Sequence, residues 1–410
     1  THSAVNSAVD TSKGKLLIFF PLFYNTVNLL YCLYSGCFTG DYLGITVNNY
    51  NLLFVTYVCS FIPQIVLWEI YKWHKKRQAM HPSHGIQINL SFLRLFVYFI
   101  FFWHISVSLL FGVNQLGEDA YQAPSFIKVF IQIFNRFPPN LIGAFYIALC
   151  GNKRFSEFLK IALLMVVFGL VKKSISSPVF IFYIALIFYG DRLLPWFKRH
   201  IFLIAFISLL SPYVIRSIYS LRDSLRGTEG IELSSEQLVF GKLFGRLSSL
   251  SNSGFIVENL FYFASQAQEL DYFYYQKQSL SGVLGMSFAP PLSPEKVLFN
   301  SLGDGDPNVS YMCGVMGNMT LSFLRSPSLL LINFVSFVLL LWLTFYLIGR
   351  MRIPWAFELA LVFQISPVMS GVANECAFVP VALCLFLLLN IVVNSCFIKK
   401  RRNEENIIYS

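Results

Sequence analysis

Long apolar segments recur along this chain, and they leave few folds open to it. Leu16–Gly36 and Leu329–Gly349 each approach the roughly twenty apolar residues that a helix needs to cross a bilayer. Hydrophobic residues make up 56% of the chain and charged residues only 13%. Soluble domains carry about 25% charged residues. The sequence therefore predicts an all-α polytopic membrane protein.

Charge clusters set the number of membrane-spanning helices and their orientation. We predict ten spans, at 16–36, 50–71, 92–112, 126–150, 158–171, 178–190, 201–218, 327–349, 355–372 and 376–397. With this count, the main clusters of Lys and Arg share one side of the membrane, which the positive-inside bias makes the cytoplasmic side. Both termini are then expected in the cytoplasm. The net charge of +10 follows from this orientation, and no soluble basic face suggests nucleic-acid binding.

The predicted spans divide the chain into five parts. A polar N-terminal tail (1–15) precedes spans one to seven (16–218), a large outward loop (219–326), spans eight to ten (327–398) and a cytoplasmic tail (399–410). The first residue is Thr1, so an upstream helix could be missing. We expect the long loop to concentrate the chemistry of the protein.

The outward loop is expected to contain amphipathic helices. Apolar residues follow helical spacing from Leu238 to Leu247 and again from Ile256 to Ala267. Both helices are expected near the membrane–water boundary. In contrast, Gly282–Asp306 is rich in Pro and Gly and is predicted to form turns.

Cationic side chains are predicted to gather at the outer membrane face. They are Arg136, Lys172, Lys173, Arg216, Arg222, Arg226 and Arg246. Such a group could bind a pyrophosphate, because Arg and Lys both bind phosphate oxygens. The alternative is that each cation extends from a helix end toward the interface. Arg136 interrupts the fourth apolar segment, and non-helical backbone at membrane depth usually lines a cavity.

Carboxylates are the candidates for a general base, because the loop contains no His. The candidates are Asp223, Glu229, Glu232, Glu258, Asp304, Asp306 and Glu375. Asp223 could simply pair with Arg226, and Glu258 could be a solvated surface charge. Asp304-Gly305-Asp306 could hold a cation but is more typical of a turn, so we predict no metal site. Glu375 is an acid in apolar surroundings and is therefore a functional candidate.

Aromatic residues are dense in the loop, and Tyr262 and Tyr274 belong to this group. They could stack on sugar rings, or they could mark the membrane interface, where Tyr is common. Cys37, Cys313 and Cys376 are expected on the outer side, where a disulfide could form.

Three segments resemble the Wzy-type O-antigen polymerases (oligosaccharide repeat unit polymerases). Phe134–Pro138 resembles the segment that these proteins place before their middle spans. Lys172–Phe180 is similar to their Lys- and Ser-rich turn that leads into an apolar helix. Pro290–Lys296 resembles the Pro-rich turn late in their large periplasmic loop. The three segments follow one another in the same order here.

The resemblance implies a glycosyltransferase of GT-C-like architecture in the bacterial inner membrane, with a periplasmic loop and no metal or other cofactor. It would join lipid-linked repeat units during lipopolysaccharide biosynthesis, releasing undecaprenyl diphosphate. Its partners would be undecaprenyl-diphosphate-linked glycans, membrane lipids and a Wzz-type chain-length regulator. The implied catalytic residues are Arg136, Lys173, Arg216, Arg246 and Glu258, and the implied substrate-binding residues are Lys172, Arg222, Arg226, Lys296, Tyr262 and Tyr274. Related ligases use a His in the outer loop, which this loop lacks.

Two other functions remain open from the sequence. A lipid-linked oligosaccharide flippase would also be polytopic, although flippases lack so long an outer loop. A membrane sugar O-acyltransferase would use a His, and His81 and His84 lie together in an inner polar segment. A structural membrane scaffold is the third alternative.

Overall fold

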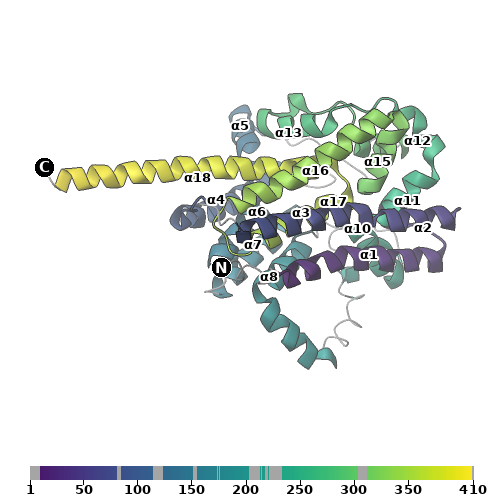
Figure 1. Ribbon diagram of the computed structural model, residues 1–410, viewed down its shortest axis with the longest axis horizontal. Coiled ribbons are helices and arrows are strands. Elements are labelled where there is room, and N and C mark those ends of the chain that lie inside the picture. The colour runs from purple at the N-terminus through teal and green to yellow at the C-terminus, as the bar shows by residue number, and fades with distance from the viewer. Residues whose placement is uncertain are drawn as a thin grey trace, which may run out of the picture.

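The computed structural model is an all-helical protein (Figure 1). It describes residues 10–80, 85–113, 123–150, 155–172, 174, 176–202, 213, 215–217, 220, 233–302 and 312–408. No strand occurs in these ranges, only two isolated bridges. The prediction of an all-α protein is therefore confirmed for the part of the chain that is described.

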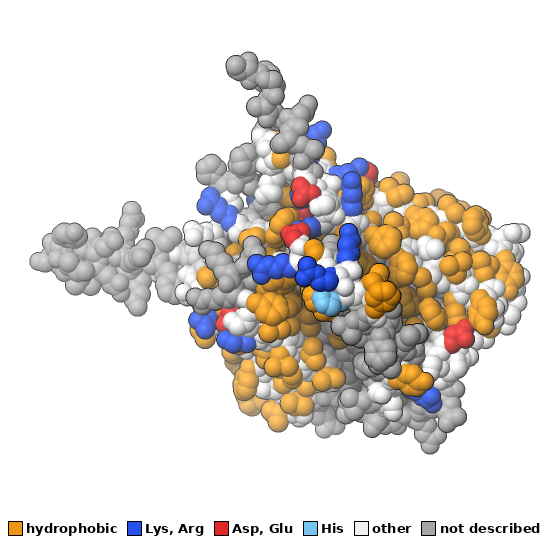
Figure 2. Space-filling view, turned by 90° about the horizontal axis from the view of Figure 1, so that it is seen from below, with side chains coloured by type: hydrophobic (Ala, Val, Ile, Leu, Met, Phe, Trp, Pro, Cys, Tyr) orange, Lys and Arg blue, Asp and Glu red, His pale blue; other side chains and the backbone are white. Residues whose placement is uncertain are grey.

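Five helical segments are long and apolar enough to cross a membrane. They are α1 (Ser12–Ser35), the pair α2 (Tyr50–Cys59) and α3 (Phe61–Met80), α4 (Leu90–Phe111), α16 (Pro327–Gly349) and the first part of α18 (Ala373–Ile408). Their outward faces are apolar: Leu95, Phe102 and Leu110 of α4 are each more than 70% exposed. Hydrophobic side chains also cover much of the face in Figure 2. A surface of this kind suits contact with lipid and suggests a membrane-embedded protein.

Shorter helices fill the space between these segments. They are α5 (Ser125–Phe134), α6 (Pro139–Cys150), α7 (Phe155–Val171), α8 (Ser176–Arg199) and α17 (Ala356–Ser370). The predicted fourth span is thus two helices, and the break at Arg136 is confirmed. Pro138 and Pro139 explain it, because Pro supplies no N–H and disfavours helix in the preceding residue. Most of the predicted seventh span, 201–218, lies outside the described residues.

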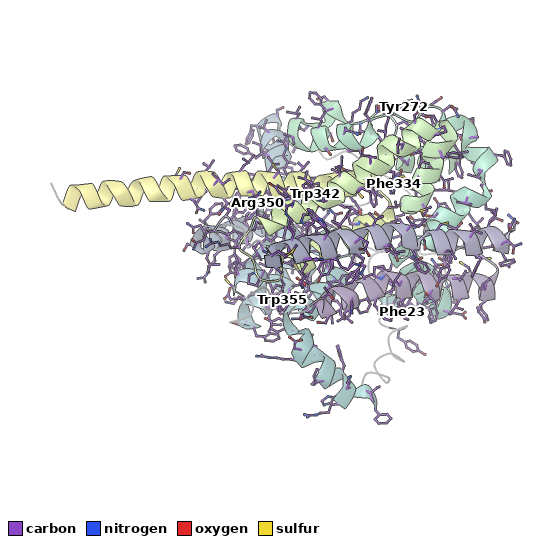
Figure 3. The ribbon with its side chains drawn as sticks, in the orientation of Figure 1. Phe23, Tyr272, Phe334, Trp342, Arg350 and Trp355 are labelled. Atoms are coloured by element: carbon purple, nitrogen blue, oxygen red, sulfur yellow. The ribbon has the colours of Figure 1, made fainter. Side chains whose placement is uncertain are left out.

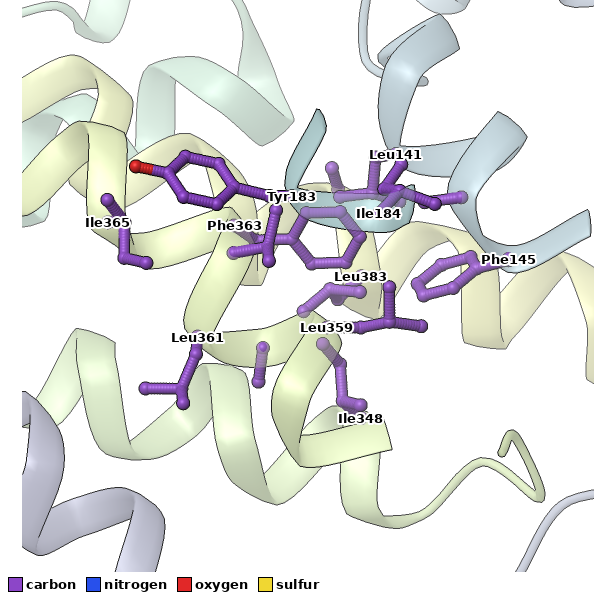
Figure 4. Packing of buried hydrophobic residues seen from close by; sticks show 14 of the residues in the cluster. Leu141, Phe145, Tyr183, Ile184, Ile348, Leu359, Leu361, Phe363, Ile365 and Leu383 are labelled. Atoms are coloured by element: carbon purple, nitrogen blue, oxygen red, sulfur yellow. The ribbon is translucent and has the colours of Figure 1, made fainter. Parts of the chain in front are cut away.

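Helix α17 lies at the centre of the protein. All of its residues except Ser366 are buried. Figure 4 shows Leu359, Leu361 and Phe363 enclosed by side chains of four other helices. These neighbours include Phe145 of α6, Tyr183 and Ile184 of α8, Ile348 of α16 and Leu383 of α18. Side-chain packing of this density stabilises the bundle by many small dispersion contacts.

The segment between the two groups of predicted spans folds into short helices. They are η2 (Gln237–Phe244), α10 (Gly245–Leu247), α11 (Leu250–Glu258), α12 (Leu260–Ala267), α13 (Tyr274–Leu284), η3 (Met286–Phe288), α14 (Pro294–Leu302) and α15 (Gly314–Arg325). The first predicted amphipathic helix is therefore a π-helix continued by α10, and the second is divided at Asn259. The segment predicted to be turn-rich, 282–306, is described as far as residue 302 and also contains helix, because Pro294 begins α14.

A close backbone contact explains why η2 and α10 bury glycines. Phe240 is exposed, whereas Gly241 and Gly245 are buried. A Cβ atom on Gly245 would lie 2.3 Å from the backbone nitrogen of Gly40. Gly40 belongs to η1 (Gly40–Tyr42), which follows α1. The contact requires two residues without side chains.

Buried amides of α1 bind the segment that joins α10 to α11. The Asn28 side chain donates to Ser248 Oγ at 2.6 Å and accepts from Ser251 Oγ at 2.9 Å. Asn25 Oδ1 accepts from the Ser248 hydroxyl and from the Ser249 backbone N–H, both at 3.0 Å. Buried polar groups need such partners, so the network fixes the position of this segment on α1.

A second glycine pair joins α15 to the turn between α17 and α18. Gly371, with φ of +67°, would place a Cβ atom 2.1 Å from the carbonyl carbon of Gly314. The Gly371 carbonyl accepts from the Asn318 amide at 3.0 Å and from the Cys313 thiol at 3.4 Å. The loop helices therefore lie directly on the end of α17.

Charged groups are buried at the opposite end of α17. Glu358, in its first turn, forms a salt bridge with Lys75 and accepts from the Tyr71 hydroxyl at 2.8 Å. Lys13 of α1 lies 3.8 Å from the centre of the Trp355 ring. Trp355 has a φ of +57°, which is rare for a large residue. Figure 3 places Trp355 and Arg350 away from Tyr272, toward the end where α18 extends.

Candidate functional site

Arg246, a predicted diphosphate ligand, forms an ion pair in the structure. Its Nε donates to Asp41 Oδ1 at 3.0 Å, and its Nη2 lies 2.9 Å from the same oxygen. The other oxygen of Asp41 accepts from the Met312 backbone N–H at 3.2 Å. Arg246 therefore helps to join η1, α10 and the start of α15.

The other predicted cations do not form one described group. The Arg136 side chain is half-buried and makes no hydrogen bond or ion pair with described residues. Arg216 and Lys296 are exposed. Lys173, Arg222 and Arg226 lie outside the described residues, as do the candidate bases Asp223, Glu229, Glu232, Asp304 and Asp306.

Glu258 and Tyr274 have structural partners that the sequence did not predict. The Glu258 carboxylate accepts from the Asn48 backbone N–H at 2.5 Å, so it holds the segment that precedes α2. The Tyr274 ring is fully buried, and its hydroxyl bonds to Asn318 and Ser322. A ring in this position cannot stack on a sugar. Tyr262, by contrast, is half-exposed on α12.

The structure instead brings Lys172 and Glu375 within electrostatic range of each other, without forming an ion pair. Lys172 directly follows α7, and Glu375 lies in the first turn of α18. The sequence did not predict that these two residues, which are far apart along the chain, would lie near each other. A carboxylate at a helix N-terminus is stabilised by the helix dipole.

Glu375 and Ser366 are both accessible at the C-terminal end of α17. Glu375 is exposed in the first turn of α18. Ser366 is exposed although every other residue of α17 is buried. Ser370 follows one helical turn after Ser366, and its hydroxyl donates to Glu375 Oε2 at 2.8 Å. These three residues therefore lie together at the C-terminal end of α17.

The position of Lys172 keeps a cation within electrostatic range of Glu375. Its backbone N–H bonds to the carbonyl of Phe168, and its Nζ lies 5.3 Å from the centre of the Phe168 ring. Burial lowers the pKa of Lys172, and the negative charge of Glu375 opposes that shift. The ammonium group therefore lies near one aromatic face and within electrostatic range of one carboxylate.

A second carboxyl group, Glu295, faces the same region from α14. Its side chain is buried, and it lies near the backbone N–H of Ala373 and the hydroxyl of Ser293. Burial raises the pKa of Glu295, and the charge of Glu375 raises it further. Burial therefore disfavours the charged form of Glu295 relative to a carboxyl group in water.

His104 is a functional candidate that the sequence interpretation missed. It lies in α4, is buried, and has its Nε2 atom 3.2 Å from the Phe134 carbonyl at the break after α5. The charge of Lys172 acts on it. The available signal was an ionisable residue within an apolar span.

This arrangement can bind an anion and accept a proton in one place. Lys172 supplies positive charge, and Glu375 supplies an accessible carboxylate. Within the described ranges, no three His, Cys, Asp or Glu residues are grouped so as to hold a metal ion. All eight cysteines are free thiols. The disulfide that was left open at the outer side is therefore absent.

Comparisons of the chain with known protein families, curated proteins and solved structures found no match.

Proposed function

We propose that this protein is a membrane glycosyltransferase that polymerises undecaprenyl-diphosphate-linked repeat units. This is the function that the resemblance implies. The observation that carries the proposal is the accessible Glu375 side chain within electrostatic range of Lys172, where the helices of the predicted loop meet α17 and α18. A reaction between two lipid-linked sugars needs a proton acceptor and a cation at one site.

The proposed step transfers the growing glycan to the acceptor. The oxygen of an acceptor hydroxyl attacks the anomeric carbon of the donor, and its proton passes to the Glu375 carboxylate. The bond between the anomeric carbon and the diphosphate oxygen breaks, and the diphosphate leaves with the electron pair. Lys172 stabilises the negative charge that develops on the leaving group. The Ser370 hydroxyl holds the carboxylate in position.

Arg136 is the second candidate for the diphosphate. Its guanidinium group is half-buried in the break between α5 and α6, and it is not engaged by a described acidic residue. Lys173, Arg222 and Arg226 remain predicted contributors. The location in the bacterial inner membrane, the periplasmic side of the loop and the Wzz-type partner belong to the same proposal.

The test begins with deletion of the gene in its native host. We expect lipid A–core that carries a single repeat unit, with the long ladder lost from a silver-stained gel. Complete loss of repeat units would indicate a flippase, and an intact ladder would contradict the polymerase proposal. A ladder of altered mobility would favour an O-acyltransferase.

Complementation then tests the site. Removing a general base costs about 10²- to 10⁴-fold in rate, so Glu375→Gln should fail to restore the ladder. Glu269→Gln is the matched control, because Glu269 is exposed at the end of α12. Immunoblots of membranes verify equal protein levels. A full ladder from Glu375→Gln would reject Glu375 as the base but leave the polymerase assignment intact.

A further inference from the structure

Helix α13 of the predicted loop packs against the sides of two long apolar helices, α16 and α18 (Figure 1). The Gln276 amide donates to Ser336 Oγ at 2.7 Å, and Ser336 lies about 13 Å along α16 from its first residue. A Cβ atom on Gly282 would lie 3.3 Å from a side-chain carbon of Val381, which is about 12 Å along α18. Helix α13 therefore reaches a depth close to half of the roughly 30 Å hydrocarbon core.

The segment that carries α13 begins and ends at one level, beside the N-terminal end of α16. The Asp271 backbone N–H donates to the Leu292 carbonyl at 3.3 Å. The Tyr272 hydroxyl lies 3.0 Å from Oγ of Ser326, the N-cap residue of α16. Between these contacts the chain runs along α16 and α18 and reverses after Gly285, which has a φ of +115°. The segment is therefore a hairpin.

The polarity of α13 is opposite to that of a helix in water. Its free face consists of Leu280, Val283 and Leu284, which are 47%, 39% and 55% exposed. The hydroxyls of Ser279 and Ser281 donate to carbonyl oxygens of the same helix, at 3.0 and 2.9 Å. A surface helix of a soluble protein turns its apolar residues to the core and its polar residues outward. The free face of α13 is therefore suited to lipid.

The one charged residue of α13, Lys277, is compensated. It forms an ion pair with Asp271, at the start of the hairpin, and the Asp271 side chain is only 8% exposed. Long cationic side chains extend their charged ends toward the membrane interface in this way. The pair therefore leaves no isolated charge on α13.

The returning limb of the hairpin has few backbone donors to leave unpaired. Pro290 and Pro291 have no N–H, and the Phe288 N–H donates to the Gly285 carbonyl at 3.1 Å. Unpaired backbone groups are costly in hydrocarbon, so non-helical backbone at membrane depth needs such economy. The Pro-rich composition of this limb is therefore compatible with burial in a membrane.

We propose that residues 271–292 form a re-entrant hairpin, which enters and leaves the membrane on the side of the loop, with the free face of α13 against lipid acyl chains. The occupant is lipid because α13 lies at the depth of α16, whose Leu331, Val335 and Leu339 are 64%, 46% and 57% exposed. The hairpin holds the loop at a fixed depth beside the first turns of α18, where Glu375 lies. This inference does not depend on the reaction that the protein catalyses.

Fluorescence quenching of the full-length protein in lipid nanodiscs tests the hairpin. A fluorescent amino acid is placed at Leu284 by amber suppression, and at Leu280 as a second position. The quenchers are a lipid with a nitroxide near the end of its acyl chain, a lipid with a nitroxide on its headgroup, and iodide in the buffer. We expect the chain-labelled lipid to quench at least about twofold more than the headgroup-labelled lipid, because roughly 15 Å of hydrocarbon separates the two nitroxides.

Two control positions calibrate the signal. Leu388 of α18 is 54% exposed within a membrane-spanning segment, so a label there should behave as the label at Leu284 does. Glu269 is exposed at the end of α12, and a label there should be quenched by iodide. Size-exclusion chromatography verifies that each labelled protein stays monodisperse.

Three results would overturn the inference. Iodide quenching at both Leu280 and Leu284 would place the free face of α13 in water, and stronger quenching by the headgroup-labelled lipid would place α13 at the interface. Quenching by none of the three would mean that a second copy of the chain or another protein covers the face. All three outcomes leave the polymerase assignment as it stands, because the ladder on the gel tests that separately.

Discussion

Replacement of Lys75 should destabilise the protein far more than its partly accessible position suggests. The Glu358 carboxylate is only 3% exposed, and Lys75 is its single basic partner among the described residues. In Lys75→Met, this carboxylate would keep only the Tyr71 hydroxyl, which donates to it at 2.8 Å. Breaking a buried pair on one side costs about 3–5 kcal/mol, mainly because a charge stays buried without compensation.

The same reasoning predicts that a second substitution recovers the loss. In Lys75→Met/Glu358→Gln no charge is left, and the amide oxygen of Gln still accepts from Tyr71. Replacing both members of a buried ion pair by neutral groups is often close to neutral. We expect the double variant to lie within about 1 kcal/mol of the wild type, so that the two substitutions couple by at least 2 kcal/mol, roughly, in their effect on stability.

Equilibrium unfolding in mixed detergent micelles measures this coupling. The signal is Trp fluorescence, because Trp68 and Trp355 lie within cation–π distance of charges at this end of the protein. Lys72→Met is the matched control, since Lys72 and Glu69 form an exposed pair that should contribute less than about 1 kcal/mol. A double variant that loses the sum of the two single effects would refute the argument that the unpaired charge dominates.

Two further predictions concern Gly371 and Glu295, which lie in the part of the protein around Glu375. Gly371→Ala should lower stability by about 2 kcal/mol or more, because it adds a clash to the cost of a left-handed backbone. Gly190→Ala should not lower stability, because no atom lies within 4 Å of the position that its Cβ would take. Equal apparent Tm values for the two variants would contradict the close approach of Gly371 to Gly314. Burial raises the pKa of Glu295 above its ordinary value of 4.5, so folding favours the protonated form relative to the unfolded chain. The contribution of Glu295 to stability is therefore present below pH 4.5 and is lost as the pH rises through the raised pKa. Glu295→Gln should therefore weaken the fall in apparent Tm above that pH, and an unchanged pH profile would count against a buried neutral acid.

The helices were predictable because their signals are local. The predicted span 327–349 begins and ends at the same residues as α16. Ser326 caps the N-terminus of this helix, and Pro327 is its first residue. The break at Arg136 was also predictable, because two prolines follow it. The π-helix at 237–244 was not, since its buried face depends on a glycine contact with a segment two hundred residues away in sequence.

The candidate site was less predictable because it depends on long-range packing. Lys172 and Glu375 were each identified as unusual, but nothing in the sequence joined them. The cations of the loop were predicted to bind diphosphate because several of them occur together, whereas Arg246 forms an ion pair with Asp41 of η1. Tyr275 belongs to the aromatic-rich part of the loop, and Ser293 and Glu295 belong to its Pro-rich segment, but their burial could not be predicted because it is a property of the folded state.

The enclosure of α17 has a consequence for how the protein is made. Its 15 residues give a helix of about 22 Å, which is shorter than the roughly 30 Å of a hydrocarbon core. It also carries Glu358 and Gln364 and presents almost no surface to lipid. We therefore expect that α17 does not leave the translocation machinery on its own, but enters the bilayer together with α18 as a hairpin closed at Gly371. The site around Glu375 would then form only after α18 has been synthesised, so a chain that ends before α18 would be inserted yet inactive.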